Sequence, residues 1–186
     1  MVITEILARN ASMYGDEIAL VERDPGKGTR TTLTWKEFDE MANRIANGLL
    51  AKGVKRGDKV IHLMMNCLEW LPAYFGILRT GAWAVPLNFR FTAEDIAYCA
   101  DIAEARIMVF GEEFIGRIDE IKEDLGSIND FIFVGPQEIK PSYAESFVDF
   151  LKTGAADDPG KEINLQDEAA LYFTSGTTGT PKPILL

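Results

Sequence analysis

The sequence predicts an α/β fold in which helices flank both faces of a mostly parallel sheet. Apolar runs of strand length alternate with amphipathic helical segments along most of the chain. Several of these runs are continuously apolar rather than alternating, which is typical of strands that are covered on both faces. We therefore expect parallel strands joined by right-handed crossovers.

Two strand-like segments near the start of the chain, residues 18–22 and 31–35, differ from this scheme. Residues 24–28 between them read Asp-Pro-Gly-Lys-Gly, which is a turn signal. We expect these segments to form an antiparallel hairpin at one end of the fold.

The clearest helix is predicted to begin after Thr34, because Thr34 and Glu37 have the spacing of a capping box. Apolar side chains follow at intervals of three and four residues and predict one buried face: Trp35, Phe38, Ala42, Ile45 and Leu49. Gly53 is suited to a left-handed helix end. The apolar run at residues 60–65 is then the first expected strand of the parallel sheet.

The same alternation continues along the chain. Further strands are expected at residues 82–87, 106–110, 131–134 and 169–173. Further helices are expected to open near Asn66 and end at Gly81, to open at Thr92, to run from Phe114 to Gly126, and to follow a capping box made by Ser142 and Glu145. Pro72 lacks a backbone donor, so it predicts a kink or a late start in its helix.

A polar segment with glycine and proline, residues 154–161, is the best linker candidate. The chain is therefore predicted to divide into an α/β subdomain over residues 1–153, a linker over residues 154–165, and a strand with a loop over residues 166–186.

Composition excludes several classes of function. Nineteen basic and 29 acidic residues give a net charge of −10, which disfavours nucleic-acid binding. Two cysteines, Cys67 and Cys99, and one histidine form no zinc-ligand pattern, and they suit a reducing compartment. The N-terminus does not resemble a secretory signal, and no apolar run has the length of a transmembrane segment. These features predict a cytoplasmic protein without a Cys-His zinc site, and no metal ligand is assigned within the chain.

Some residues invite functional interpretations that packing explains better. His62 lies within an apolar strand and is expected to be a hydrogen-bonded structural histidine. The acidic residues between positions 112 and 124 are expected to form the solvated face of a helix. One aromatic group at helical spacing is expected to belong to the core: Trp70, Tyr74 and Phe75.

The segment most informative about chemistry is 174–182, Thr-Ser-Gly-Thr-Thr-Gly-Thr-Pro-Lys. Glycines let backbone N–H groups approach a ligand closely, hydroxyls add donors, and Lys182 supplies positive charge, so the segment predicts a cradle for a polyphosphate. It is not a Walker A loop, because Pro181 stands where the second glycine belongs. The alternative is a flexible Ser/Thr/Gly linker, but such linkers usually lack an adjoining buried strand and a terminal Pro-Lys.

Residues 172–182 closely resemble the phosphate-loop signature of the AMP-forming adenylating enzymes, which include acyl-CoA synthetases, firefly-type luciferases and peptide-synthetase adenylation domains. Residues 33–60 and 76–88 resemble two further segments of that family, and the fatty acyl-CoA ligases are the most similar subfamily. Members are several hundred residues long. The resemblance therefore implies that this chain is the first part of the large N-terminal α/β domain of an adenylate-forming enzyme.

The resemblance implies a two-step reaction in the full-length enzyme. A carboxylic acid, by this likeness a fatty acid, attacks ATP to give an acyl-adenylate and pyrophosphate, and coenzyme A then displaces AMP to form a thioester. ATP, Mg²⁺ and coenzyme A are the implied cofactors.

The resemblance also implies which residues bind phosphate. Those expected to hold the β- and γ-phosphates of ATP are Thr174, Ser175, Gly176, Thr177, Thr178 and Gly179, with Lys182 neutralising charge nearby. Pro183 stands where the family usually has glycine. No catalytic residue is assigned within the chain, so the isolated fragment is expected to be inactive, and its apolar end is expected to promote self-association: Ile184, Leu185 and Leu186.

Two other functions remain open at this point. The first is a non-catalytic nucleotide-binding or regulatory module built on the same part of the α/β domain. Tight binding of ATP and pyrophosphate by the isolated chain would support it. A structural interaction domain with an incidental loop would instead be insensitive to a change of Lys182.

Overall fold

The central element is a five-stranded sheet in which every neighbouring pair of strands is parallel, with the order β4-β3-β5-β6-β7. The computed structural model describes residues 1–26, 28–175 and 180–186. The strands of the sheet are β3 (Lys59–Leu63), β4 (Trp83–Pro86), β5 (Ile107–Gly111), β6 (Asp130–Val134) and β7 (Glu145–Ser146). The predicted parallel sheet is thus confirmed.

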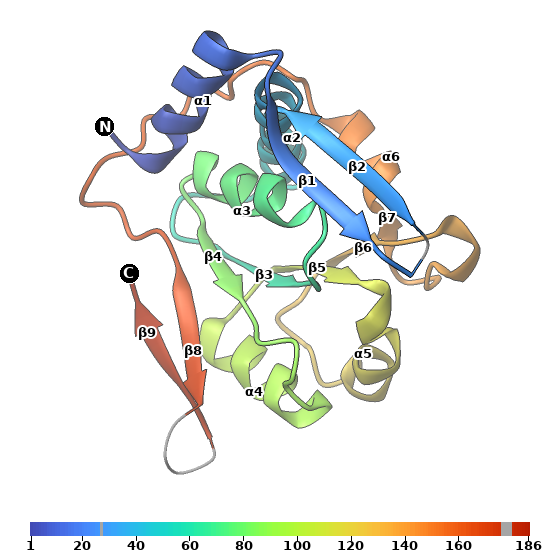
Figure 1. Ribbon diagram of the computed structural model, residues 1–186. Helices are drawn as coiled ribbons and strands as arrows, with labels where there is room; N and C mark the ends of the chain where they lie inside the picture. Colours follow the sequence, from blue (N-terminus) through green and yellow to red (C-terminus); the bar gives the residue numbers. More distant parts are fainter. Residues whose placement is uncertain (27, 176–179) are drawn as a thin grey trace.

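Helices cover both faces of the sheet (Figure 1). One face carries α2 (Trp35–Ala51), α3 (Trp70–Arg79) and α6 (Phe147–Thr153), with α1 (Ile3–Tyr14) packed on the outside of α2. The other face carries α4 (Ala93–Ala103) and α5 (Ile115–Ile121). Short 3-10 turns lie at Glu112–Phe114 and Gln137–Ile139. This three-layer arrangement is the one that the alternating sequence pattern predicts.

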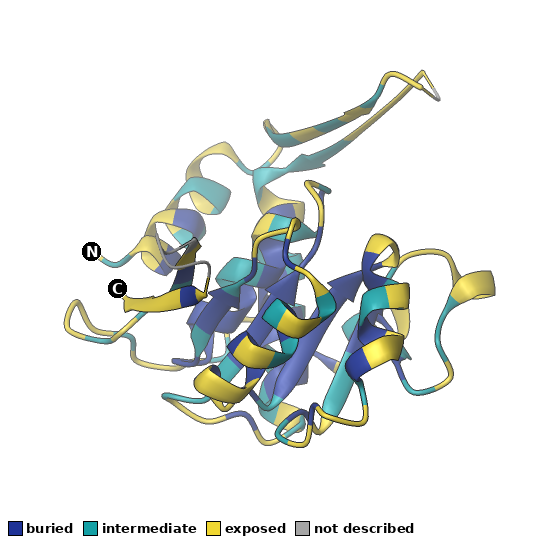
Figure 2. Cartoon of the chain, turned by 90° about the horizontal axis from the view of Figure 1, so that it is seen from below, coloured by how far each residue is buried: buried dark blue, intermediate teal, exposed yellow. Residues whose placement is uncertain are grey.

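Alternate side chains of the central strands feed two apolar layers. In β3, Val60 packs among side chains of α2 and α3, whereas Ile61 packs in the layer that contains Ile96 of α4. Buried residues are accordingly concentrated in the sheet and on the helix faces turned toward it (Figure 2). Because both faces of the sheet are covered, the central strands must be apolar at successive positions, as the sequence indicates.

The helix starts predicted from a capping box at Thr34 and from a cap at Thr92 are confirmed. Thr34 Oγ1 accepts a hydrogen bond from the Glu37 backbone N–H at 3.2 Å, and the Glu37 carboxylate accepts one from Thr34 N–H at 2.8 Å. That backbone donor lowers the pKa of Glu37. Thr92 and Asp95 make the same reciprocal pair, and Gly53, with a φ of 82°, follows α2 as expected.

Two helices have different bounds from those predicted. Helix α3 begins at Trp70, which is the late start predicted from Pro72. Pro72 therefore lies in the first turn, where backbone N–H groups have no partner within the helix and the missing donor costs nothing. The expected end of α5 at Gly126 is wrong. The helix ends at Ile121, and Leu125 is buried from the turn that follows it.

The predicted capping box at Ser142 and Glu145 is also wrong. Helix α6 begins at Phe147, and its cap is Ser146, whose Oγ accepts from Asp149 N–H at 3.2 Å. Glu145 lies in β7 and forms an ion pair with Lys52 at 2.8 Å. This contact across the fold holds Glu145 in the sheet rather than in a helix.

The N-terminal hairpin is confirmed, and it consists of β1 (Ile18–Asp24) paired antiparallel with β2 (Thr29–Thr34). It projects from the body of the molecule and carries mainly exposed and half-buried residues (Figure 2). Helix α1, which precedes the hairpin, is an element that the sequence analysis did not predict.

The segment predicted as a linker is attached to α2 by polar side chains. Asn43 Nδ2 donates to the Ala156 carbonyl oxygen at 2.8 Å, and Arg44 Nη1 donates to the Gly154 carbonyl oxygen at 3.1 Å. Asn47 Nδ2 donates to the carbonyl oxygens of residues 155 and 157. The start of the segment is therefore held by the helix, while the division of the chain at this point stays a prediction.

Gly154 is expected to tolerate no side chain. A Cβ atom there would overlap the Arg44 carbonyl oxygen and lie 2.9 Å from Gly48 N. Because both neighbours are backbone atoms of α2, we expect Gly154→Ala to lower the free energy of unfolding by about 1–3 kcal/mol, as overpacking does. Urea unfolding measures this change.

Gly116 provides the matched control, because it lies in α5 and a Cβ atom there would meet no other described part of the chain within 4 Å. Gly116→Ala is expected to raise the unfolding free energy by about 0.5–1 kcal/mol through helix propensity. Equal effects of the two substitutions would contradict the close approach at Gly154.

Candidate phosphate-binding hairpin

The candidate site lies on a second antiparallel hairpin, β8 (Leu171–Ser175) with β9 (Pro181–Leu185). Thr174 on β8 is directly opposite Lys182 on β9, and both residues are exposed. Opposed residues of an antiparallel pair have Cβ atoms about 5 Å apart on the same face. The structure thus brings together a hydroxyl and an ammonium group, two groups that bind phosphate oxygens.

The remaining predicted phosphate-binding residues lie at the end of this hairpin. Ser175 is the last residue of β8 and pairs with Pro181. The other four lie outside the described residues: Gly176, Thr177, Thr178 and Gly179. Of the predicted site, the structure therefore places Thr174 and Lys182 with their side chains.

Ile184 and Leu185, two of the apolar residues near the C-terminal end of the chain, lie in this hairpin. Leu185 pairs with Leu171 and Ile184 pairs with Tyr172, so β9 folds back on β8. Pro183 fits because prolines are tolerated in edge strands. A signal for this hairpin was present in the sequence, since a Gly-rich segment separates two apolar runs. Ile184 and Leu185 remain 44% and 46% exposed, and self-association through them stays a prediction.

The hairpin lies next to the edge strand of the main sheet. Ala170 and Ala84 form a parallel bridge, and Ala84 N–H donates to the Ala169 carbonyl oxygen at 3.0 Å. Strands β8 and β4 run side by side in the same direction (Figure 1). The end of β8 is therefore at the carboxyl edge of the sheet, which is where open α/β sheets bind ligands.

A group of packed rings, His62, Trp70 and Tyr74, lies next to β8, which Tyr74 contacts through Tyr172. The ring centroids of His62 and Trp70 are 4.4 Å apart, and Trp70 stacks on Tyr74 at 5.6 Å. His62 is only 1% exposed. A structural role is consistent with this burial, but the expected hydrogen bond is wrong, because neither ring nitrogen has a partner within the described part of the chain.

Burial lowers the pKa of His62 from 6.5 to about 3. The unfolded chain then binds a proton below pH 6.5 that the folded protein does not bind until about pH 3, so stability is lost as the pH falls through this range. The expected slope is about 1.4 kcal/mol per pH unit.

His62→Phe is expected to remove this slope, since phenylalanine keeps a ring among Trp70 and Tyr74 without titrating. Urea unfolding at pH 7, 6 and 5 measures the difference, and His62 is the only histidine in the chain. A variant whose stability falls with pH as steeply as that of the wild type would contradict a neutral His62.

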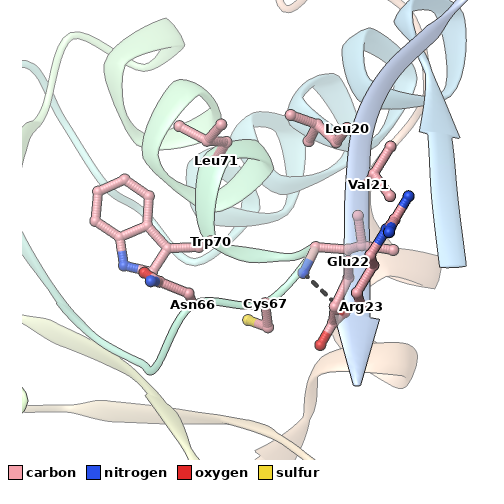
Figure 3. Close-up of a pocket in the computed structure, with 9 residues that line it drawn as sticks. Leu20, Val21, Glu22, Arg23, Asn66, Cys67, Trp70 and Leu71 are labelled. Atoms are coloured by element: carbon pink, nitrogen blue, oxygen red, sulfur yellow. Dashed lines mark hydrogen bonds between the residues drawn. The ribbon is translucent and has the colours of Figure 1, made fainter. Parts of the chain in front are cut away.

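A cavity of about 480 Å³ separates β1 from the start of α3 (Figure 3). Its wall includes Val21, Asn66, Cys67 and Trp70, and the Glu22 carboxylate accepts a hydrogen bond from Leu68 N–H at 3.3 Å. Neither Thr174 nor Lys182 lines it, so it is separate from the candidate phosphate site.

The other residues weighed in the sequence behave as packing predicts. Cys67 and Cys99 are free thiols, and burial raises the pKa of each to about 12.

In residues 1–26, 28–175 and 180–186, no three His, Cys, Asp or Glu side chains form a group that could hold a metal. The same ranges contain no helix with both the length and the apolar character needed to span a membrane.

The sequence matches the family described as AMP-binding enzyme over residues 7–186. The chain belongs to this family. Two of its relatives are named as CoA ligases. It is 31% identical to the long-chain-fatty-acid–CoA ligase FadD13 of Mycobacterium tuberculosis over 160 residues. This alignment covers 84% of this chain and 30% of that protein. It is 33% identical over 154 residues to the 3-hydroxybenzoate–CoA/4-hydroxybenzoate–CoA ligase of Thauera aromatica, covering 83% and 29%.

Solved structures of AMP-binding enzymes have the same fold. The inhibitor-bound N-terminal domain of FACL13 from Mycobacterium tuberculosis has a TM-score of 0.85 and 30% identity, over 99% of this chain and 44% of that one. The anthranilate CoA ligase AuaEII has a TM-score of 0.86 and 28% identity, over 98% and 34%. The predicted resemblance to adenylate-forming enzymes is confirmed, and the chain spans about a third of the length of its curated relatives.

Proposed function

We propose that the protein is an ATP-dependent, AMP-forming acyl-CoA synthetase. The observation that carries this proposal is the β8–β9 hairpin, in which Thr174 and Lys182 face one another at the base of a hydroxyl- and glycine-rich segment. Membership of the AMP-binding enzymes, together with relatives named as CoA ligases, supports the same reaction class.

In the proposed reaction, an oxygen of the substrate carboxylate forms a bond to the α-phosphorus of ATP, and the bond from that phosphorus to pyrophosphate breaks. The sulfur of coenzyme A then attacks the acyl carbon of the adenylate, its proton is lost, and AMP leaves. Negative charge therefore builds up on the departing pyrophosphate, which preorganised donors stabilise.

This chain supplies donors for that charge. The Lys182 ammonium provides a positive charge beside the Thr174 hydroxyl. The residues that we propose to hold the β- and γ-phosphates are Thr174, Ser175, Gly176, Thr177, Thr178 and Gly179. A Mg²⁺ ion would neutralise phosphate charge when bound. The described residues include no cluster of metal ligands, so we assign none of them to it.

For the acid, we propose a fatty acid as the first substrate to test, because FadD13 is named as a long-chain-fatty-acid–CoA ligase. Other relatives are named for hydroxybenzoate and for crotonobetaine or carnitine, so aromatic acids and carnitine derivatives are the alternatives. We place the reaction in the cytoplasm, since the free thiols Cys67 and Cys99 suit a reducing compartment.

The experiment is ATP–pyrophosphate exchange by the full-length protein with a panel of fatty, aromatic and carnitine-type acids. We expect exchange that depends on one class of acid, and AMP release that additionally requires coenzyme A. Binding of ATP and pyrophosphate without exchange for any acid would instead support a regulatory module. An absence of both binding and exchange would support a structural interaction domain.

A further inference from the structure

The two tyrosines Tyr74 and Tyr172 join helix α3 to the hairpin that carries the candidate site. Their hydroxyl oxygens are 3.2 Å apart, within hydrogen-bond distance. Tyr74 is held in turn by stacking on Trp70 at a centroid distance of 5.6 Å and an interplanar angle of 11°. The hydroxyl pair therefore links β8 to a well-packed part of the molecule.

Tyr172 lies on the same face of β8 as Thr174, because side chains two residues apart in a strand point the same way. On the opposite strand, Ile184 and Lys182 share this face. Two residues of a strand span roughly 6.6 Å. The anchored tyrosine is thus one strand repeat away from the predicted phosphate-binding side chains.

The backbone bridge between β8 and the main sheet lies at the start of β8. Strand β8 is not a member of the five-stranded sheet, and its bridge to β4 is at Ala170, just before the strand begins. Further along, Leu171 and Phe173 pack into the apolar layer beside α4. Apolar contacts are non-directional, whereas a hydrogen bond fixes an orientation.

We propose that Tyr74 is a positioning residue for ATP: through its hydrogen bond to Tyr172 it sets the orientation of β8 and thereby the placement of Thr174 and Lys182 against the phosphates. This inference rests on the proposed function. Tyr74 itself touches neither of the two phosphate-binding side chains in this scheme, and it acts through β8.

The test uses the full-length protein and three variants: Tyr74→Phe, Tyr172→Phe and the double variant. Each removes a hydroxyl and keeps the ring, so packing is retained. We expect each single variant to raise the KM for ATP roughly three- to tenfold, the range of one hydrogen bond. The KM for the acid is expected to stay unchanged. The double variant is expected to resemble the singles, because the two hydroxyls form one interaction. Tyr98→Phe, an exposed tyrosine on α4, is the control.

The outcomes separate this inference from the proposed function. If the wild type shows no ATP–pyrophosphate exchange with any acid, the proposed function fails and this inference fails with it. If the wild type is active but the tyrosine variants lower only the Tm and keep the KM for ATP, the hydroxyl pair is structural and this inference alone is overturned. Additive effects of the two substitutions would also overturn it.

Discussion

Replacing Arg79 by alanine is expected to lower the free energy of unfolding by about 3–5 kcal/mol, the range for breaking a buried ion pair. Arg79 is 5% exposed and lies at the end of α3. Its guanidinium forms an ion pair with the Asp39 carboxylate, and it donates to the Asp39 carbonyl oxygen at 3.0 Å and to Asn43 Oδ1 at 2.6 Å. Alanine leaves all of these acceptors without their donor inside the α2–α3 interface.

Two variants separate charge from packing in this measurement. Arg79→Met keeps much of the aliphatic volume, so a loss close to that of Arg79→Ala would attribute the effect to the polar network. Arg9→Ala, at an exposed position on α1, is expected to change stability by no more than about 0.5 kcal/mol. Urea unfolding of the three variants tests the account, which an Arg79→Ala change as small as that of Arg9→Ala would refute.

Replacing Lys182 by alanine is expected to lower kcat/KM for ATP–pyrophosphate exchange about 100- to 1,000-fold, as the loss of one charge-stabilising donor does. The reason is that Lys182 supplies positive charge on the same face of the hairpin as Thr174. Its exposed side chain contributes little to the core, so the free energy of unfolding is expected to stay nearly unchanged.

Lys182→Arg and Lys161→Ala complete the comparison. Arginine keeps the charge but presents it in a planar fork, so an intermediate rate is expected. Lys161 is exposed in the segment before β8, and its removal is expected to leave the exchange rate within about twofold of the wild type, as for an exposed residue away from the site. Equal rates for Lys182→Ala and Lys161→Ala would show that Lys182 does not stabilise the reaction.

Features of the fold that depend on neighbouring residues could be predicted from the sequence. The helix starts at Thr34 and Thr92 follow from side chains within four residues, a capping box at Thr34 and a threonine cap at Thr92, and the structure contains both starts. The strand at residues 59–63 follows from a continuous apolar run. The helix caps depend on contacts within a few residues along the chain. The strand depends on a continuous apolar run, which has to be buried on both faces.

Features that depend on distant residues could not be predicted. Ser142 has the spacing of a capping box, but the helix starts later because Glu145 pairs with Lys52, more than ninety positions away. Asn43 and Asn47 donate hydrogen bonds to the segment at 155–157, more than one hundred positions away, and no residue near them in the sequence indicates this contact. Periodicity also says nothing about strand order, which depends on how the crossovers pack.

The candidate site shows the same division. The hydroxyl, glycine and lysine pattern predicts a phosphate-binding segment from the sequence alone. The pairing of Thr174 with Lys182 depends on β9 folding back on β8, and the contact between Tyr74 and Tyr172 joins residues from separate elements. The hairpin itself has a local signal in the Gly-rich segment between two apolar runs, but the contact between the tyrosines has none, because it forms only when β8 packs beside α3.

The most direct test of phosphate binding by the β8–β9 hairpin is calorimetric titration of the full-length protein, as wild type and as Lys182→Ala, with ATP and with AMP. Lys182 is assigned to the phosphates that AMP lacks. We therefore expect the substitution to weaken ATP binding about tenfold or more, the range of a charge-assisted contact, while AMP binding is unchanged. Equal weakening of ATP and AMP binding, or no weakening of either, would contradict the assignment.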